Sequence, residues 1–76
     1  MNKSRRKQIA EVLEALNTLR DTVEAIQNEE QEAFDNIPES LEGTDRYDQA
    51  EEAVSNIDDA LSSLEDAIDS LENAKE

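Results

Sequence analysis

The chain has 76 residues, neither cysteine nor histidine, and a formal net charge of −14. A chain this short forms one domain whose core is marginal, because it buries only about 60% of its unfolded surface. Without cysteine or histidine it has no disulfide staple, no usual zinc site and no Ser–His or Cys–His catalytic pair. We therefore expect a small domain that relies on helix packing or oligomerisation.

The N-terminal region is basic and the remainder is acidic. Residues 1–20 carry five basic and two acidic groups, for +3, whereas residues 21–76 carry nineteen acidic and two basic groups, for −17. Such an excess repels nucleic acid and anionic lipid at long range and attracts basic proteins, so direct nucleic-acid or membrane binding is not expected. "MNKSRRK" has the charge of a signal-peptide start, but Glu11 and Glu14 interrupt the apolar segment that should follow. We predict a cytoplasmic protein.

The first predicted element is a helix over about residues 4–36. Its apolar residues recur at steps of three and four, which is typical of a coiled-coil seam. The residues at these steps are Ile9, Val12, Leu16, Leu19, Val23, Ile26, Glu30, Ala33 and Ile37. Glu30 is the polar exception, and it either lies at a frayed edge or pairs with a base such as Arg46.

The predicted corner, residues 37–44, contains the only proline and the only glycine of the chain. Pro38 lacks an N–H and restricts Ile37, so the first helix should end near Asn36, and "PESL" can form one further turn. Gly43 suits a left-handed position, and Thr44 suits the N-cap of the next helix. The corner therefore predicts that the chain reverses direction.

The second predicted helix spans about residues 45–74 and is apolar at every seam position. These positions are Tyr47, Ala50, Val54, Ile57, Leu61, Leu64, Ile68 and Leu71. A continuous rod would instead carry the first register onto four acidic residues, which desolvation disfavours. We predict an all-α, antiparallel two-helix coiled-coil hairpin, with Leu19 near Leu61 and Leu16 near Leu64.

A repeat of small residues runs along the second predicted helix: Ala53, Ala60, Ala67 and Ala74 are spaced by seven. Such a row either reflects helix propensity on a neutral surface or admits a neighbouring helix. The second interpretation predicts a homodimer in the form of a four-helix bundle.

No residue set indicates an enzyme, a cofactor or a metal site. The serines have no base beside them, paired carboxylates would need a water-poor cleft, and the Glu-x-x-His motif of bundle metal sites is absent. Two sets remain as candidate partner-binding residues. The acidic face consists of Glu51, Glu52, Asp58, Asp59, Glu65, Asp66 and Asp69. The tip cluster consists of Phe34, Ile37, Leu41 and Tyr47, which either close the end of the hairpin or anchor a partner.

The segments "EEQEAFDNIPESL" and "EEAVSNIDDALSSLEDAIDSLENA" resemble those of small acidic proteins encoded by phages and mobile elements of Gram-positive bacteria. Their shared feature is the "F-D-N-[hydrophobic]-P-E-S-L" corner after a Lys/Arg-rich start, and the resemblance implies the cytoplasm of a bacterial host. The plan is also similar to that of the small plasmid RNA-binding hairpin that dimerises into a four-helix bundle, although the basic face for RNA is missing here.

Two functions follow, both non-enzymatic. In the first, the acidic face binds and modulates a basic, nucleic-acid-handling host protein, as a DNA mimic with an anti-defence role would. A hairpin carries about half of the charge density of duplex DNA, so two hairpins side by side approach it. In the second, the chain is a structural coiled-coil module that binds itself or a cognate phage protein through its apolar seam.

Overall fold

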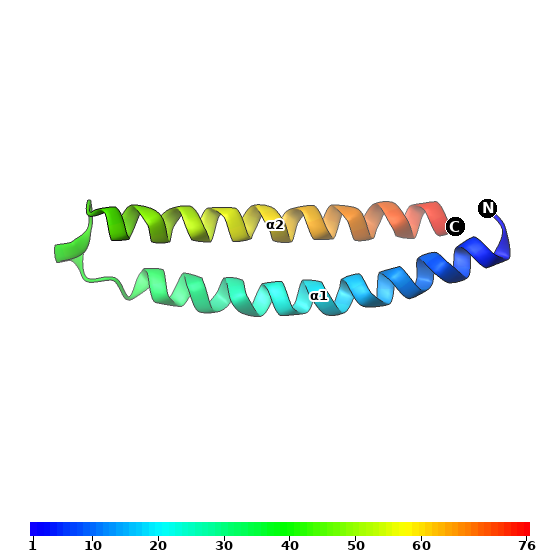
Figure 1. Ribbon diagram of the computed structural model, residues 1–76, viewed down its shortest axis with the longest axis horizontal. Coiled ribbons are helices and arrows are strands. Elements are labelled where there is room, and N and C mark those ends of the chain that lie inside the picture. The colour runs from blue at the N-terminus through cyan, green and yellow to red at the C-terminus, as the bar shows by residue number, and fades with distance from the viewer.

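The computed structural model describes all 76 residues and consists of helices only. The α-helix α1 spans Lys3–Asp35, the short 3₁₀ helix η1 spans Glu39–Leu41, and the α-helix α2 spans Asp45–Lys75. α1 and α2 lie side by side and antiparallel, so that both termini are at the same end (Figure 1). The hairpin measures 59 × 15 × 13 Å. The predicted all-α helical hairpin is confirmed.

Several polar side chains of α1 form hydrogen bonds with the backbone of the helix, one at its start and others along its length. The Asn2 side chain accepts a hydrogen bond from the Arg5 backbone N–H (2.8 Å), which satisfies one of the free donors of the first turn. Further along, the hydroxyls of Thr18 and Thr22 donate to the carbonyls four residues earlier, each at 3.2 Å. Such bonds tend to bend a helix, and α1 is visibly bowed in Figure 1.

The corner forms as its residue types require. Pro38, at φ −60°, starts η1, and the Leu41 N–H donates to the Pro38 carbonyl (2.9 Å). Gly43 adopts φ +83°, in the left-handed region where a side chain would be strained. Thr44 caps α2, because its hydroxyl accepts from the Tyr47 N–H (3.3 Å) and donates to the Leu41 carbonyl (2.6 Å). The reversal therefore rests on local backbone chemistry.

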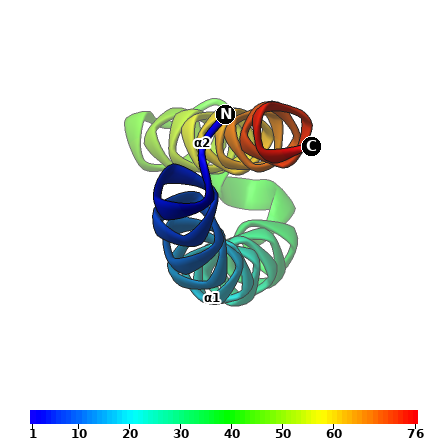
Figure 2. The same ribbon diagram turned by 90° about the vertical axis from the view of Figure 1, so that its right-hand side faces the viewer.

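The two long helices wind around each other. Figure 2 looks along the hairpin from its open end, and α2 runs from right to left above α1 as it recedes, while α1 runs from left to right below it. This is a left-handed winding, as expected when inward-facing residues recur every 3.5 residues. Such a winding keeps the same rows of each helix turned toward the other helix.

The inward-facing rows confirm the prediction for α2 and correct it for α1. The residues of α2 that lie inward include all eight predicted seam positions, with Leu61 and Ile68 fully buried. On α1 the inward-facing residues alternate in steps of four and three instead: Ile9, Leu13, Leu16, Arg20, Val23, Gln27, Glu30 and Phe34. Leu13 is the only buried residue of α1. Half of the predicted α1 seam, namely Val12, Leu19, Ile26 and Ala33, is exposed.

Heptad spacing alone does not decide which two rows of α1 face α2. The row of Leu13 and Phe34 also borders the central row of Ile9, Leu16 and Val23, although it contains the polar residues Arg20 and Gln27. The chosen pair of rows buries Leu13 and brings Phe34 to Tyr47 at the corner. Leu19, which was predicted to lie in the seam near Leu61, is 54% exposed, whereas Leu61 is buried. The alternative that paired Glu30 with Arg46 is also not observed: the one ion pair of the hairpin joins Arg20 and Asp21.

Candidate functional site

An exposed row of large apolar side chains runs along α1. We define the apolar row as Val12, Leu19 and Ile26, which are 48%, 54% and 45% exposed. Against this, only Leu13, Leu61 and Ile68 of the whole chain are buried, at 5%, 9% and 4% exposure. Single exposed apolar residues are normal on a protein surface, but a regular row of three on one helix is a candidate packing surface.

The alanine row (Ala53, Ala60, Ala67 and Ala74) lies on the same side of the hairpin. Each residue of the apolar row comes one position before an inward-facing residue of α1, as Val12 does before Leu13. Likewise, each alanine comes one position before an inward-facing residue of α2, as Ala60 does before Leu61. Stepping back by one residue rotates the side chain by about 100° around the helix axis, in the same direction on both helices. A two-fold axis perpendicular to the plane of the two helices relates one antiparallel helix to the other, and this rotation leaves each side of the plane unchanged. The apolar row and the alanine row therefore lie on the same side of the hairpin, which we call the apolar side.

A hollow at the open end agrees with this placement. It has a volume of about 280 Å³ and is lined by Met1, Arg5, Gln8, Ile9 and Val12 of the N-terminal region and by Leu71 of α2. A second hollow of about 500 Å³ is lined by Glu11, Glu14, Ala15, Thr18 and Leu19 and faces outward from α1. The hollow at Val12 is therefore the one that lies on the apolar side.

A hydrogen bond marks the opposite side of the hairpin. The Gln27 side-chain amide donates to the Asp58 carboxylate across the pair. Asp58 comes one position after the inward-facing Ile57, so it is turned away from the apolar side. Glu51 and Glu65 likewise follow the inward-facing Ala50 and Leu64. α2 therefore presents alanines on one side and carboxylates on the other.

All seven residues of the predicted acidic face are exposed. They occupy one side and the outer surface of α2, away from the alanine row, and none of them takes part in an ion pair. Nothing in the hairpin neutralises them, so their field extends into solvent over the length of α2. The arrangement would allow a basic surface to approach α2 from outside while the apolar side remains free.

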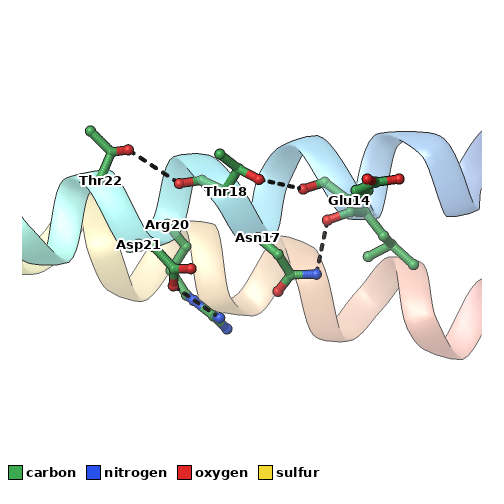
Figure 3. Close-up of polar contacts among 7 residues, drawn as sticks. Glu14, Asn17, Thr18, Arg20, Asp21 and Thr22 are labelled. Carbon is green, nitrogen blue, oxygen red and sulfur yellow. Dashed lines mark hydrogen bonds and ion pairs between the residues drawn. The ribbon is translucent and has the colours of Figure 1, made fainter.

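The polar side chains in the middle of α1 bond within their own helix (Figure 3). The Asn17 amide donates to the Leu13 carbonyl (2.9 Å), and the Arg20 guanidinium lies 3.3 Å from the carboxylate of its neighbour Asp21. An exposed ion pair of this kind contributes at most about 1 kcal/mol. Arg20 is nonetheless an inward-facing residue of α1, so the hairpin accepts a charged side chain there while Leu19 beside it stays outside.

The tip cluster holds the corner together. All four of its side chains are half-buried, and the rings of Phe34 and Tyr47 lie tilted with their centroids 5.0 Å apart. Burial raises the pKa of the Tyr47 hydroxyl above its ordinary value of 10.0, and the nearby carboxylates of Glu42, Glu51 and Asp48 raise it further. The pair stacks across the corner, which corresponds to the interpretation as a closing plug; the role as a partner anchor stays a prediction.

No group of three or more acidic residues is placed so that it could hold a metal ion. Neither α1 nor α2 offers a stretch that is both long and apolar enough for a membrane crossing. No known family model, no curated protein and no solved structure matches the chain. The apolar and acidic sides of the hairpin therefore have to be interpreted from their chemistry.

The exposed apolar row was not singled out by sequence reasoning, which placed all of its members in the seam. A signal was present: Leu13 and Phe34 are apolar and lie just outside the predicted seam of α1. Either rotation of α1 leaves apolar side chains outside the contact with α2, because Leu13 and Phe34 lie on one side of the central row and Val12, Leu19 and Ile26 on the other. Considering both rotations would have brought the exposed apolar row into view.

Proposed function

We propose that the chain is a non-enzymatic assembly module that self-associates through its apolar side. The observation that carries this proposal is the exposure of the apolar row while Arg20, Gln27 and Glu30 face α2. Full burial of the three exposed side chains would contribute roughly 1 kcal/mol each, since each is about half exposed in the single hairpin. Packing of one hairpin on another supplies that burial in a four-helix bundle.

The experiment compares two substitutions on opposite sides of α1. Leu19→Glu places a charge in the centre of the apolar row, whereas Ala10→Glu places the same charge at an exposed position on the other side. Sedimentation equilibrium should give the wild-type chain and A10E a mass of twice the 8.5 kDa monomer or more. L19E should stay monomeric and helical. A monomeric wild-type chain at about 100 μM would contradict self-association.

The acidic face supports a second function. Its seven carboxylates are exposed and take part in no ion pair, and they remain outside when the apolar side is covered. Their negative charge favours binding to a basic, nucleic-acid-handling protein. Fourteen net charges over 59 Å are roughly one per 4 Å. Two associated hairpins would carry roughly one per 2 Å, near the one per ~1.7 Å of duplex DNA.

This second function is tested by charge reversal at constant net charge. Asp58, Asp59 and Glu65 are replaced by lysine in one variant, and Glu11, Glu14 and Glu24 on α1 in the control. The readout is recovery of proteins from a nuclease-treated Gram-positive lysate, with and without competing duplex DNA. Basic nucleic-acid enzymes should bind the wild type and the control, be released by DNA and salt, and fail to bind the α2 variant. Equal recovery by both variants would contradict the acidic face as the site.

A further inference from the structure

The charge of the hairpin is divided unevenly between its two ends. The tip, residues 29–52, contains ten acidic residues and one basic residue, for −9. The open end, residues 1–20 with residues 61–76, contains seven acidic and six basic residues, for −1. The four cations of the first seven residues make no ion pair within the hairpin. One end is thus strongly negative, and the other is nearly neutral with free cations.

The apolar side is also symmetric about a single point. Val12 and Ile26 lie seven residues on either side of Leu19, so the apolar row has its centre at Leu19. On α2, the central alanines Ala60 and Ala67 have their midpoint between residues 63 and 64. A surface that is symmetric in this way can be complementary to itself, as an interface around a two-fold axis requires.

The two midpoints lie at nearly the same height along the hairpin. The ring contact of Phe34 with Tyr47 and the hydrogen bond of Gln27 to Asp58 make residues of the two helices level where their numbers add up to about 81 to 85. Leu19 is then level with about residues 62 to 66. The alanine midpoint lies within this span. One two-fold axis can therefore pass through the centres of both rows.

We propose that a second copy of the chain packs head to tail on the apolar side, around a two-fold axis at Leu19. This arrangement rests on the self-association proposed above and adds its orientation and register. α1 packs against α1 of the second copy, with Leu19 opposite Leu19 and Val12 opposite Ile26. α2 packs against α2 of the second copy through the small side chains of the alanine row.

Electrostatics favours this orientation over the side-by-side alternative. With the tips together, two −9 regions would meet at one end of the bundle. Head to tail, each tip lies against an open end of −1. Arg5, which belongs to the same row as Val12 and borders the hollow, then lies within about one helical turn of Glu29 and Glu32 of the second copy. Attraction between such charges selects orientation more than it adds affinity.

The available area is that of a stable pair. One long side of a hairpin of 59 × 15 Å offers roughly 800–900 Å² in projection, close to the ~800 Å² per partner of a standard-size interface. A second copy covers the whole apolar row and the alanine row at once. A single partner helix would cover only one of the two rows.

A distance between tips tests the orientation. The chain has no cysteine, so Ser40→Cys in the exposed η1 carries one spin label per copy. Double electron–electron resonance should give a distance above about 40 Å between the two labels at position 40, since the hairpin is 59 Å long. A distance below about 25 Å in a dimer would overturn the head-to-tail arrangement and leave self-association standing. A monomeric mass by sedimentation would overturn both.

A cross-link tests the register. Leu19→Cys should oxidise to a disulfide-linked dimer, because the two-fold axis brings the two Leu19 positions together. Ala10→Cys, on the opposite side of α1, should remain unlinked under the same conditions. In the side-by-side arrangement α1 packs on α2 of the second copy, and Leu19→Cys would not link. Equal linking of the two variants would overturn the proposed register.

Discussion

α1 and α2 have almost the same length but use their apolar residues differently. α2 places its apolar seam entirely inward, with alanines on one side of the seam and carboxylates on the other, so α1 alone can cover its large apolar side chains. α1 turns one apolar row outward and accepts Arg20 and Gln27 in the inward-facing rows. If the proposed self-association holds, α2 mainly completes the hairpin, and α1 also supplies the surface that packs on a second copy.

The largest difference is expected between truncation of a buried side chain of α2 and truncation of an exposed side chain of the apolar row of α1. Ile68→Ala deletes a side chain that is only 4% exposed and should lower the free energy of unfolding by about 2–5 kcal/mol at any protein concentration. Leu19→Ala should cost little in dilute solution and more as concentration rises, because the proposed dimer would cover Leu19. Urea unfolding followed by circular dichroism at 5 and 200 μM measures both. A loss for L19A that does not depend on concentration would contradict the distinction.

The corner can be weakened without touching either helix. Gly43→Ala forces a side chain into φ +83° but meets no atom within 4 Å. We expect a loss of about 1–2 kcal/mol from backbone strain alone, seen as a lower midpoint in urea. Gly43→Asn should lose less, since asparagine tolerates this conformation better. An unchanged midpoint in G43A would show that the corner does not hold the left-handed conformation.

The two helix caps provide a smaller, paired test. Thr44→Ala removes the bond to the Tyr47 N–H next to the half-buried tip cluster, and should cost about 1 kcal/mol. Asn2→Ala removes the matching bond to the Arg5 N–H at the exposed open end, where fraying relieves the loss, and should cost less. Thermal unfolding of both variants gives the comparison. A larger loss in N2A would contradict a rigid tip and a loose open end.

The smallest expected effect is the titration of Tyr47. Its pKa is raised above 10.0 by burial and by nearby carboxylates, so the folded chain holds the phenolic proton more tightly than the unfolded chain does. The resulting stability is fully present below pH 10 and is lost as the pH rises through the folded-state pKa. Because Tyr47 is the only tyrosine, absorbance at about 295 nm reports it directly. Ionisation at the same pH in the native and urea-unfolded chain would contradict the burial of this ring.

Much of the fold could be predicted because its signals are local. Pro38, Gly43 and Thr44 act on their own backbone, so the position of the reversal and the start of α2 follow from residue type. The seam of α2 followed from one clean apolar pattern with acids on one side of it. Nothing in these inferences depended on how the helices meet.

The rotation of α1 could not be predicted in the same way. Whether Leu19 or Leu13 faces α2 depends on the fit of whole rows against a partner and on where Phe34 meets Tyr47. These are tertiary contacts, and the periodicity of the sequence is compatible with either rotation. The candidate acidic and tip residues were recognisable by type, whereas the exposed apolar row emerged only once the rotation was known.

Both ends of the chain meet at one extremity of the hairpin, with Met1 near Glu76 (Figure 1). A reporter fused to either terminus would therefore sit at the opposite end of the 59 Å hairpin from η1 and leave the corner unobstructed. In a head-to-tail pair, fused domains would project from opposite extremities, so the bundle would act as a rigid spacer that holds two cargoes apart.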